Sequence, residues 1–129
     1  MDQHNWGTIP REEMNPKTVR QVVHTERMTI ARILLRKGGV VGMHHHENEQ
    51  VTMMKSGALR FVFGGAETGR EVVVREGDVL QIPPNLPHMV EALEDSMATD
   101  LFSPRREDWL RGDDAYLRNP DPGNPDPTR

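Results

Sequence analysis

Residues 38–57, GGVVGMHHHENEQVTMMKSG, contain three consecutive histidines inside a longer pattern of spaced residues. Five, one, three and six residues separate the members of that pattern, which are Gly38, His44, His46, Gln50 and Gly57. Alternate side chains of a β-strand lie on the same face, so His44 and His46 are expected to point together and His45 to point away. Two neutral imidazoles directed into one space supply half of a transition-metal site.

The bulk composition narrows the alternatives for this histidine run. An expression tag or a solvated loop is the other interpretation, but the run is internal and only three residues long. The 129 residues suit one domain, and the absence of cysteine excludes disulfides and thiolate metal ligands. Net charge is −4 with acids and bases interspersed, so neither nucleic acid nor membrane is an expected partner. Because residues 1–14 are polar and lack a signal-peptide segment, the expected location is the cytoplasm.

Short runs of alternating apolar and polar residues predict an all-β fold. Glycine-rich and proline-rich turns separate these runs, as in sandwiches and barrels. The predicted strands are Val19–His24, Thr29–Leu35, Gln50–Lys55, Ala58–Phe63, Glu71–Arg75, Val79–Ile82, His88–Ala92 and Met97–Phe102.

The two ends of the chain differ from this β-rich centre. Residues 1–16 are predicted to form an N-terminal arm, 17–112 a β-barrel domain and 113–129 a proline-rich tail. Trp6 and Ile9 would anchor the arm to a partner subunit, with disorder as the alternative. A short helix is expected at Pro104–Leu110, with Ser103 as its cap.

A third imidazole follows a second glycine and proline pattern. His88 follows Asn85 with two residues between them, in the stretch that begins at Gly77 and includes Pro83, and a tight turn there would direct it into the same interior. Gln50 is the fourth candidate ligand. A shell of three histidines and one amide leaves the charge of a divalent cation uncompensated, which favours an anionic substrate or a developing oxyanion.

These two patterns resemble the motifs of the cupin superfamily, over about residues 20–102. Gln50 stands where the first motif usually has glutamate, and Asn85 replaces a glycine of the second. The resemblance implies a single-domain cupin, a double-stranded β-helix or jelly-roll barrel with a short C-terminal helix. It implies one divalent transition metal ion, Zn, Ni, Fe or Mn, held by His44, His46, Gln50 and His88.

A third cluster follows the last predicted strand. Asp100 and Phe102 share one face of that strand, so an acid and an aromatic ring can both look into the cavity. Asp100 is a candidate general acid or base, and Phe102 a wall for a small ring. Arg106 is expected at a turn near the pocket mouth, where its planar fork can bind a carboxylate. The alternative is a structural ion pair between Asp100 and Arg106.

This segment resembles the KdgF pectin-degradation proteins, which are small cupins with three histidines and a glutamine on the metal. Asp100, Phe102, Ser103, Pro104, Arg106, Glu107 and Asp108 match their Asp-x-Phe-Ser/Thr-Pro-x-Arg-Glu-Asp-like segment. The resemblance implies linearisation of 4,5-unsaturated monouronates from pectin or alginate to open-chain keto-uronates, and a homodimer. Asp100 and Arg106 would then be catalytic, and Phe102 and Arg106 would contact an anionic sugar acid.

Two other functions stay open on the sequence alone. One is a non-catalytic cupin that binds a sugar acid. The other is a metal-dependent cupin oxygenase that acts on another small molecule, which would need a redox-active metal and usually a more anionic ligand shell than Gln50 provides. An isomerase-type enzyme is the leading hypothesis, because the resemblance to the KdgF proteins implies ring opening and Asp100 is a candidate acid–base group beside the metal site.

Overall fold

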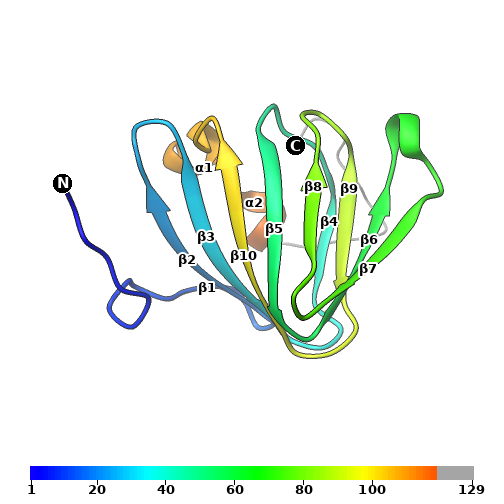
Figure 1. The fold of residues 1–129 in the computed structure, drawn as a ribbon, viewed down its shortest axis with the longest axis horizontal. Coiled ribbons are helices and arrows are strands. Elements are labelled where there is room, and N and C mark those ends of the chain that lie inside the picture. The colour runs from blue at the N-terminus through cyan, green and yellow to red at the C-terminus, as the bar shows by residue number, and fades with distance from the viewer. Residues whose placement is uncertain (119–129) are drawn as a thin grey trace.

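The chain folds into two antiparallel β-sheets that face each other (Figure 1). The computed structural model describes residues 1–118. Its strands are β1 Glu12–Asn15, β2 Thr18–His24, β3 Thr29–Leu35, β4 Val40–His44, β5 Glu49–Ser56, β6 Ala58–Phe63, β7 Glu71–Arg75, β8 Val79–Ile82, β9 His88–Ala92 and β10 Ser96–Ser103. Its helices are the 3-10 turn η1 Gly65–Glu67, α1 Glu107–Leu110 and α2 Ala115–Arg118. None of the helices described is long and apolar enough to cross a bilayer.

The strand order interleaves the two halves of the chain. One sheet has the order β1-β2-β3-β10-β5-β8, and the other has the order β4-β9-β6-β7. Strands β10 and β9 each lie between two strands from the first half of the chain, which is the jelly-roll arrangement. The predicted all-β jelly-roll barrel is therefore confirmed, and each predicted strand is present.

Two observed strands, β1 and β4, were not among the predicted ones. Strand β1 has the sequence EEMN, in which charged residues hide the alternation, although Met14 is buried in the core. Strand β4 contains Gly42, which weakens a strand signal. His44 is its last residue, so His46 lies beyond the strand, and yet both side chains are buried inside the barrel.

The barrel core is built from the inward faces of both sheets. Phe61 and Phe63 stack with ring centroids 6.4 Å apart, and Ile82 opposite them is fully buried. Strand β10 turns Ala98, Asp100 and Phe102 toward this interior. Most of the side chains around them are apolar, so a partly buried polar group such as Asp100 needs a hydrogen-bond partner there.

Two turns depend on a left-handed backbone. At Gly57, φ is +84°, and an added Cβ would collide with the backbone of Asp95 and with Ser96. At Asn85, φ is +63°, a conformation that asparagine tolerates better than most residues. The Asn85 amide donates a 2.8 Å hydrogen bond to the carbonyl of His46, so this turn joins the two halves of the histidine cluster.

The N-terminal arm is shorter than predicted. Residues 12–15, which the prediction assigned to the arm, pair with β2 as an edge strand. Trp6 and Ile9 contact the chain's own sheet, because Gln21 donates hydrogen bonds to both of their carbonyls. The guanidinium of Arg32 also lies 4.8 Å from the Trp6 ring centroid.

The C-terminal segment also differs from its prediction. The predicted helix at Pro104–Leu110 begins only at Glu107, because Ser103 is still paired with Glu49 in the sheet and cannot cap a helix. The predicted tail began at residue 113, but residues 115–118 form α2, which lies against β1 and β4. Helix α2 therefore closes the open side between the two sheets. Residues 119–129 of the predicted tail lie outside the described part.

An ion-pair cluster anchors α2. Asp114 is 4% exposed and accepts a 3.0 Å hydrogen bond from Arg20, which also contacts Glu12. Arg118 donates to the same carboxylate. Burial alone would raise the pKa of Asp114, but the bonds from Arg118 and Arg20 outweigh it and hold the pKa below its usual value.

We predict that Asp114→Asn destabilises the fold by about 2 kcal/mol at pH 7, because the buried Arg20 loses one of its two carboxylate partners. A carboxyl whose pKa is lower in the folded state adds stability above its unfolded pKa of about 3.9 and loses it as the pH falls through the folded value. The difference between variant and wild type should thus shrink in denaturant melts below about pH 4. Glu94→Gln, at an exposed acid, is the control. An equal difference at pH 7 and pH 3 would contradict the assignment.

Candidate metal centre

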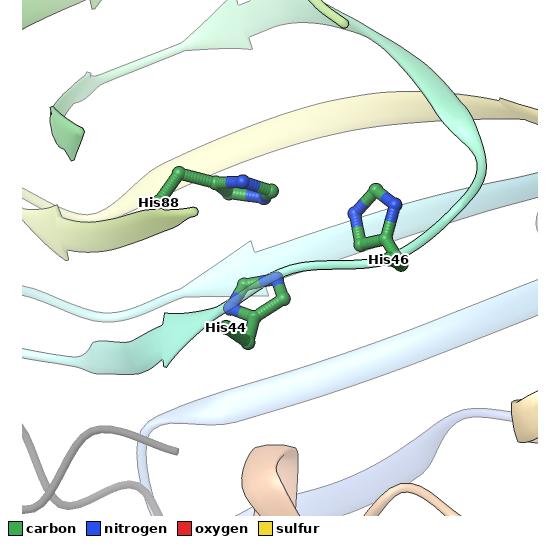
Figure 2. Close-up of side chains that lie close together, drawn as sticks. All are labelled: His44, His46 and His88. Atoms are coloured by element: carbon green, nitrogen blue, oxygen red, sulfur yellow. The ribbon is translucent and has the colours of Figure 1, made fainter. Parts of the chain in front are cut away.

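Three histidines from three places in the chain meet inside the barrel (Figure 2). His44 ends β4, His46 lies in the loop after it, and His88 begins β9 directly opposite His44 in the ladder. One ring nitrogen from each lies within 4.8 Å of the others, and all three side chains are buried. This spacing fits a single ion bound by three imidazoles, because ligands at about 2.0–2.1 Å from one centre lie only a few Å apart.

Backbone carbonyls select the tautomer of each imidazole. The Nδ1 atoms of His44, His46 and His88 lie 2.8, 2.9 and 2.8 Å from the carbonyls of Gly42, Asn48 and Leu86. A carbonyl can only accept a hydrogen bond, so each Nδ1 must carry the proton. In a neutral ring each Nε2 then has a free lone pair, which is the state that a metal requires.

The interior also keeps the rings neutral. Burial lowers the pKa of His46 to about 3, with a further decrease from the charge of Arg106. Burial lowers the pKa of His88 to about 4 and that of His44 well below its ordinary value. At neutral pH the Nε2 atom of each of the three imidazoles therefore carries a lone pair and no proton.

Gln50, the predicted fourth ligand, lies beside His46. Its Oε1 lies 3.1 Å from Nε2 of His46, while its Nε2 donates to Thr52, which donates a 2.7 Å bond to Asp100. An ionised Asp100 can only accept a hydrogen bond, so the Thr52 hydroxyl must donate to it and can accept from the Gln50 NH₂ group. The Gln50 NH₂ group is thereby fixed toward Thr52, and its Oε1 faces His46. Two lone pairs, one on His46 and one on Gln50, then face each other without a proton between them. A bound cation resolves that repulsion, so the donor set fits a divalent metal ion.

Asp100 and Phe102 occupy the positions that strand alternation predicts. Both line a small inner cavity together with His44 and His88. Burial raises the pKa of Asp100 to about 6, against the opposing effect of the hydrogen bond from Thr52. The Phe102 ring meets the His46 ring edge-on at 5.6 Å. An acid, an aromatic wall and the histidines thus surround one space.

Arg106 does not lie at the pocket mouth, as we expected, but in the interior at 1% exposure. It does not pair with Asp100 either. Its Nε and Nη2 bind the two carboxylate oxygens of Asp108 at 3.0 and 2.8 Å. Its guanidinium lies over the rings of Phe102 and Trp109, at 4.7 and 4.4 Å from their centroids. Because these two rings exclude water from the guanidinium, the cation needs a carboxylate partner within the protein. Asp108, two residues further along the same segment, supplies it.

Four residues that the sequence analysis did not select belong to the site. Thr52 orients the amide of Gln50, and strand alternation could have identified it because it lies two residues further along β5. Asn48 donates to the carbonyls of Pro104 and Arg105 and thereby holds the His46 loop. The Tyr116 hydroxyl accepts hydrogen bonds from Arg106 Nη2 and from Trp109 Nε1. The local sequence carries no signal for either role.

Two cavities adjoin the histidines. The inner cavity measures about 60 Å³ and is mostly apolar. A larger outer pocket, about 440 Å³, opens to the surface and is lined by His45, His46, Glu47, Asn48, Glu107, Asp108, Arg111, Asp113 and Tyr116. Its size falls within the range of small-molecule sites, about 300–1,000 Å³.

Fold and site together define a jelly-roll barrel with a three-histidine centre suited to one divalent metal ion. Residues 31–103 match the profile of the cupin domain, and the chain belongs to the cupin family. Among curated proteins, oxalate decarboxylase OxdC of Bacillus subtilis (strain 168) is 31% identical over 80 residues, or 60% of this chain. The match spans only 20% of the length of that relative.

Two solved structures match most of the chain. KdgF from a Halomonas species is 28% identical with a TM-score of 0.75, over 84% of this chain and all of that one. An RmlC-like cupin from Shewanella frigidimarina NCIMB 400 has a TM-score of 0.76 at 23% identity, over 84% of this chain and 96% of that one. The chain is thus a small cupin that resembles KdgF.

We predict that His88→Ala weakens the binding of Zn²⁺ by more than 100-fold, since loss of an outer partner of a ligand alone typically costs about 10–100-fold. Isothermal titration with Zn²⁺ measures the affinity, and melting curves check the fold. The matched control is His45→Ala, which removes the neighbouring imidazole whose side chain is not in the cluster. Equal losses in the two variants would show that the cluster does not hold the metal.

Proposed function

We propose that this cupin opens the ring of 4,5-unsaturated monouronates and releases open-chain keto-uronates. The supporting observation is the partly buried Asp100, which lines the same cavity as His44 and His88 and is linked to Gln50 through Thr52. The resemblance to the KdgF proteins covers both the four metal-ligand positions and the segment from Asp100 to Asp108. A carboxyl group beside a metal site fits proton transfer better than simple binding.

The reaction is an isomerisation that moves one proton. The anomeric hydroxyl loses its proton, the bond between C1 and the ring oxygen breaks, and an aldehyde and an enolate result. The enolate then takes a proton at C4 and becomes a ketone. Asp100 would accept the first proton and return it at C4, and Phe102 would pack against the ring. When bound by the histidines and Gln50, a divalent ion supplies Lewis-acid polarisation of substrate oxygens.

We predict that Asp100→Asn lowers kcat by about 100- to 10,000-fold, because the amide cannot accept a proton. The assay follows the loss of enol absorbance when metal-loaded protein is mixed with lyase-generated unsaturated monouronate. The affinity for Zn²⁺ should change little, because the amide oxygen of the variant can still accept the bond from Thr52. Wild-type turnover in this variant would overturn the role of Asp100.

The same assay separates the other candidate functions. A sugar-acid-binding cupin would bind the monouronate without accelerating its loss. A cupin oxygenase would consume oxygen with a phenolic or thiol substrate. Wild-type protein that shows no acceleration with any bound metal would remove the proposed reaction.

We also propose a homodimer formed through the outer face of the six-stranded sheet. Met53 and Val79 are neighbours across β5 and β8 there, and they are 38% and 63% exposed. Leu101 and Ile30 continue this apolar surface on β10 and β3. The six strands contain 38 residues, and at about 3.3 Å per residue and about 4.8 Å between strands they give a face of roughly 600 Å². With the N-terminal arm, a second copy would reach the size of a stable interface, roughly 600–1,000 Å² per partner.

We predict that Met53→Lys combined with Val79→Lys converts the dimer to a monomer, because two buried cations would face an apolar surface. Light scattering coupled to size-exclusion chromatography measures the mass. Val73→Lys, at a similarly exposed valine of the other sheet, is the matched control. A wild-type protein that is monomeric at micromolar concentration would contradict the proposed dimer.

A further inference from the structure

Tyr116 separates the two cavities beside the histidines. It is the one residue that lines both the inner cavity and the outer pocket, within residues 1–118. Its ring lies 4.7 Å from the ring of His44, centroid to centroid. Helix α2, which carries it, lies against β4 and β1 (Figure 1). A molecule that reaches Asp100 from the outer pocket must therefore pass the phenol ring.

The inner cavity is too small for the proposed substrate while Tyr116 is in place. A single water needs about 10–15 Å³ of such volume, so about 60 Å³ accommodates a few waters and not a six-carbon acid. The outer pocket is large enough, but Asp100 and Phe102 do not line it. Substrate binding next to Asp100 therefore requires the phenol to move.

The hydroxyl of Tyr116 occupies a position that two donors define. Arg106 Nη2 donates to it at 2.6 Å, and Trp109 Nε1 donates to it at 3.0 Å. Neither donor is free to turn away. Asp108 holds the guanidinium in bidentate fashion, and Trp109 is 8% exposed, with the Arg106 and Arg20 guanidinium groups lying over its ring. A preorganised pair of N–H groups, one of them cationic, is a site for an anionic oxygen.

We propose that Arg106 Nη2 and Trp109 Nε1 form a carboxylate-binding subsite, and that the Tyr116 hydroxyl occupies it until a substrate carboxylate takes its place. This inference rests on the proposed function for the identity of the substrate as a sugar acid. A carboxylate oxygen is a stronger acceptor than a neutral phenol for a cationic donor, so the exchange favours an anionic ligand over a neutral sugar.

When the Tyr116 ring moves aside, the inner cavity and the outer pocket join, and the sugar acid can occupy the combined space. The carboxylate at Arg106 would place the sugar ring beside Phe102, over which the same guanidinium lies. Asp100, His44 and His88 line that cavity. Trp109 is therefore a substrate-binding residue, and Tyr116 is a specificity-determining residue, because it excludes molecules that cannot replace its hydroxyl.

The test compares Tyr116→Phe with wild type for binding of D-galacturonate, a stable uronate, by titration calorimetry on zinc-loaded protein. The variant keeps the ring but leaves two buried N–H donors without an acceptor, a cost that the bound carboxylate removes. We expect it to bind galacturonate about tenfold more tightly than wild type. D-galactose, which lacks the carboxylate, should show no such gain.

A second variant addresses the donors. Trp109→Phe keeps an aromatic ring under the two guanidinium groups but removes the Nε1 donor, and it should weaken galacturonate binding about tenfold. Trp6→Phe, at the only other tryptophan, is the matched control and should leave affinity unchanged. Melting curves confirm that each variant is folded.

The chain has a single tyrosine, so displacement can be observed directly. Protein labelled with fluorotyrosine has one fluorine resonance, and galacturonate should shift it toward the position of an exposed ring. An unshifted resonance at saturation, or equal affinity of wild type and Tyr116→Phe, would overturn the subsite. If the subsite is confirmed while no unsaturated uronate is linearised, the proposed reaction is wrong and the carboxylate site stands.

Discussion

The site depends on one constraint, which is that several lone pairs are held together in the interior with no proton between them. Three backbone carbonyls accept hydrogen bonds from the Nδ1–H groups of the histidines. Each Nε2 lone pair is thereby directed inward. Thr52, which lies on β5 with Gln50, accepts a hydrogen bond from the Gln50 NH₂ group and so leaves the amide oxygen facing His46. Such an arrangement is unfavourable on its own. It becomes favourable with a cation at the centre, so the hydrogen bonds around the ligands, and not the ligands alone, make this a metal site.

The C-terminal segment is the second part on which the site depends. The two sheets leave a gap between β1 and β4, and α1 and α2 fill it with Trp109, Tyr116 and Leu117. Because Trp109 lies under two guanidinium groups, this wall contains two buried cations, and Asp108 and Asp114 compensate them. The barrel is therefore closed by paired charges as well as by apolar packing. A wall of this kind has fixed hydrogen-bond geometry, which a purely apolar wall would lack.

Sequence reasoning succeeds here where the relevant physics is local. Strand alternation is enough to place Asp100 and Phe102 on the inner face of β10. The expected separation of His45 from its two neighbours also holds, although His45 and His46 lie beyond the end of β4. Sequence reasoning fails for residues 113–118, because their environment is made by packing against β1, β2 and β4, far away in the sequence. It fails for Arg106 because Phe102, Trp109 and Tyr116 surround its guanidinium, and strand alternation does not describe this packing. A proline-rich composition suggests an extended tail from residue 113, yet Asp114 and Leu117 are buried, since tertiary contacts outweigh weak local preferences.

The position of Arg106 changes what its predicted role can mean. An arginine at a pocket mouth attracts anions by charge, whereas a buried arginine that already forms an ion pair adds little net charge. What Arg106 retains is direction, because Asp108 holds its plane and leaves Nη2 aimed at the phenol oxygen. Selection of a substrate in this cupin would then depend on the geometry of two exchangeable hydrogen bonds, from Arg106 and Trp109, rather than on long-range attraction. This also accounts for the acids in the outer pocket, since a site that recognises its ligand at close range does not need a positive entrance.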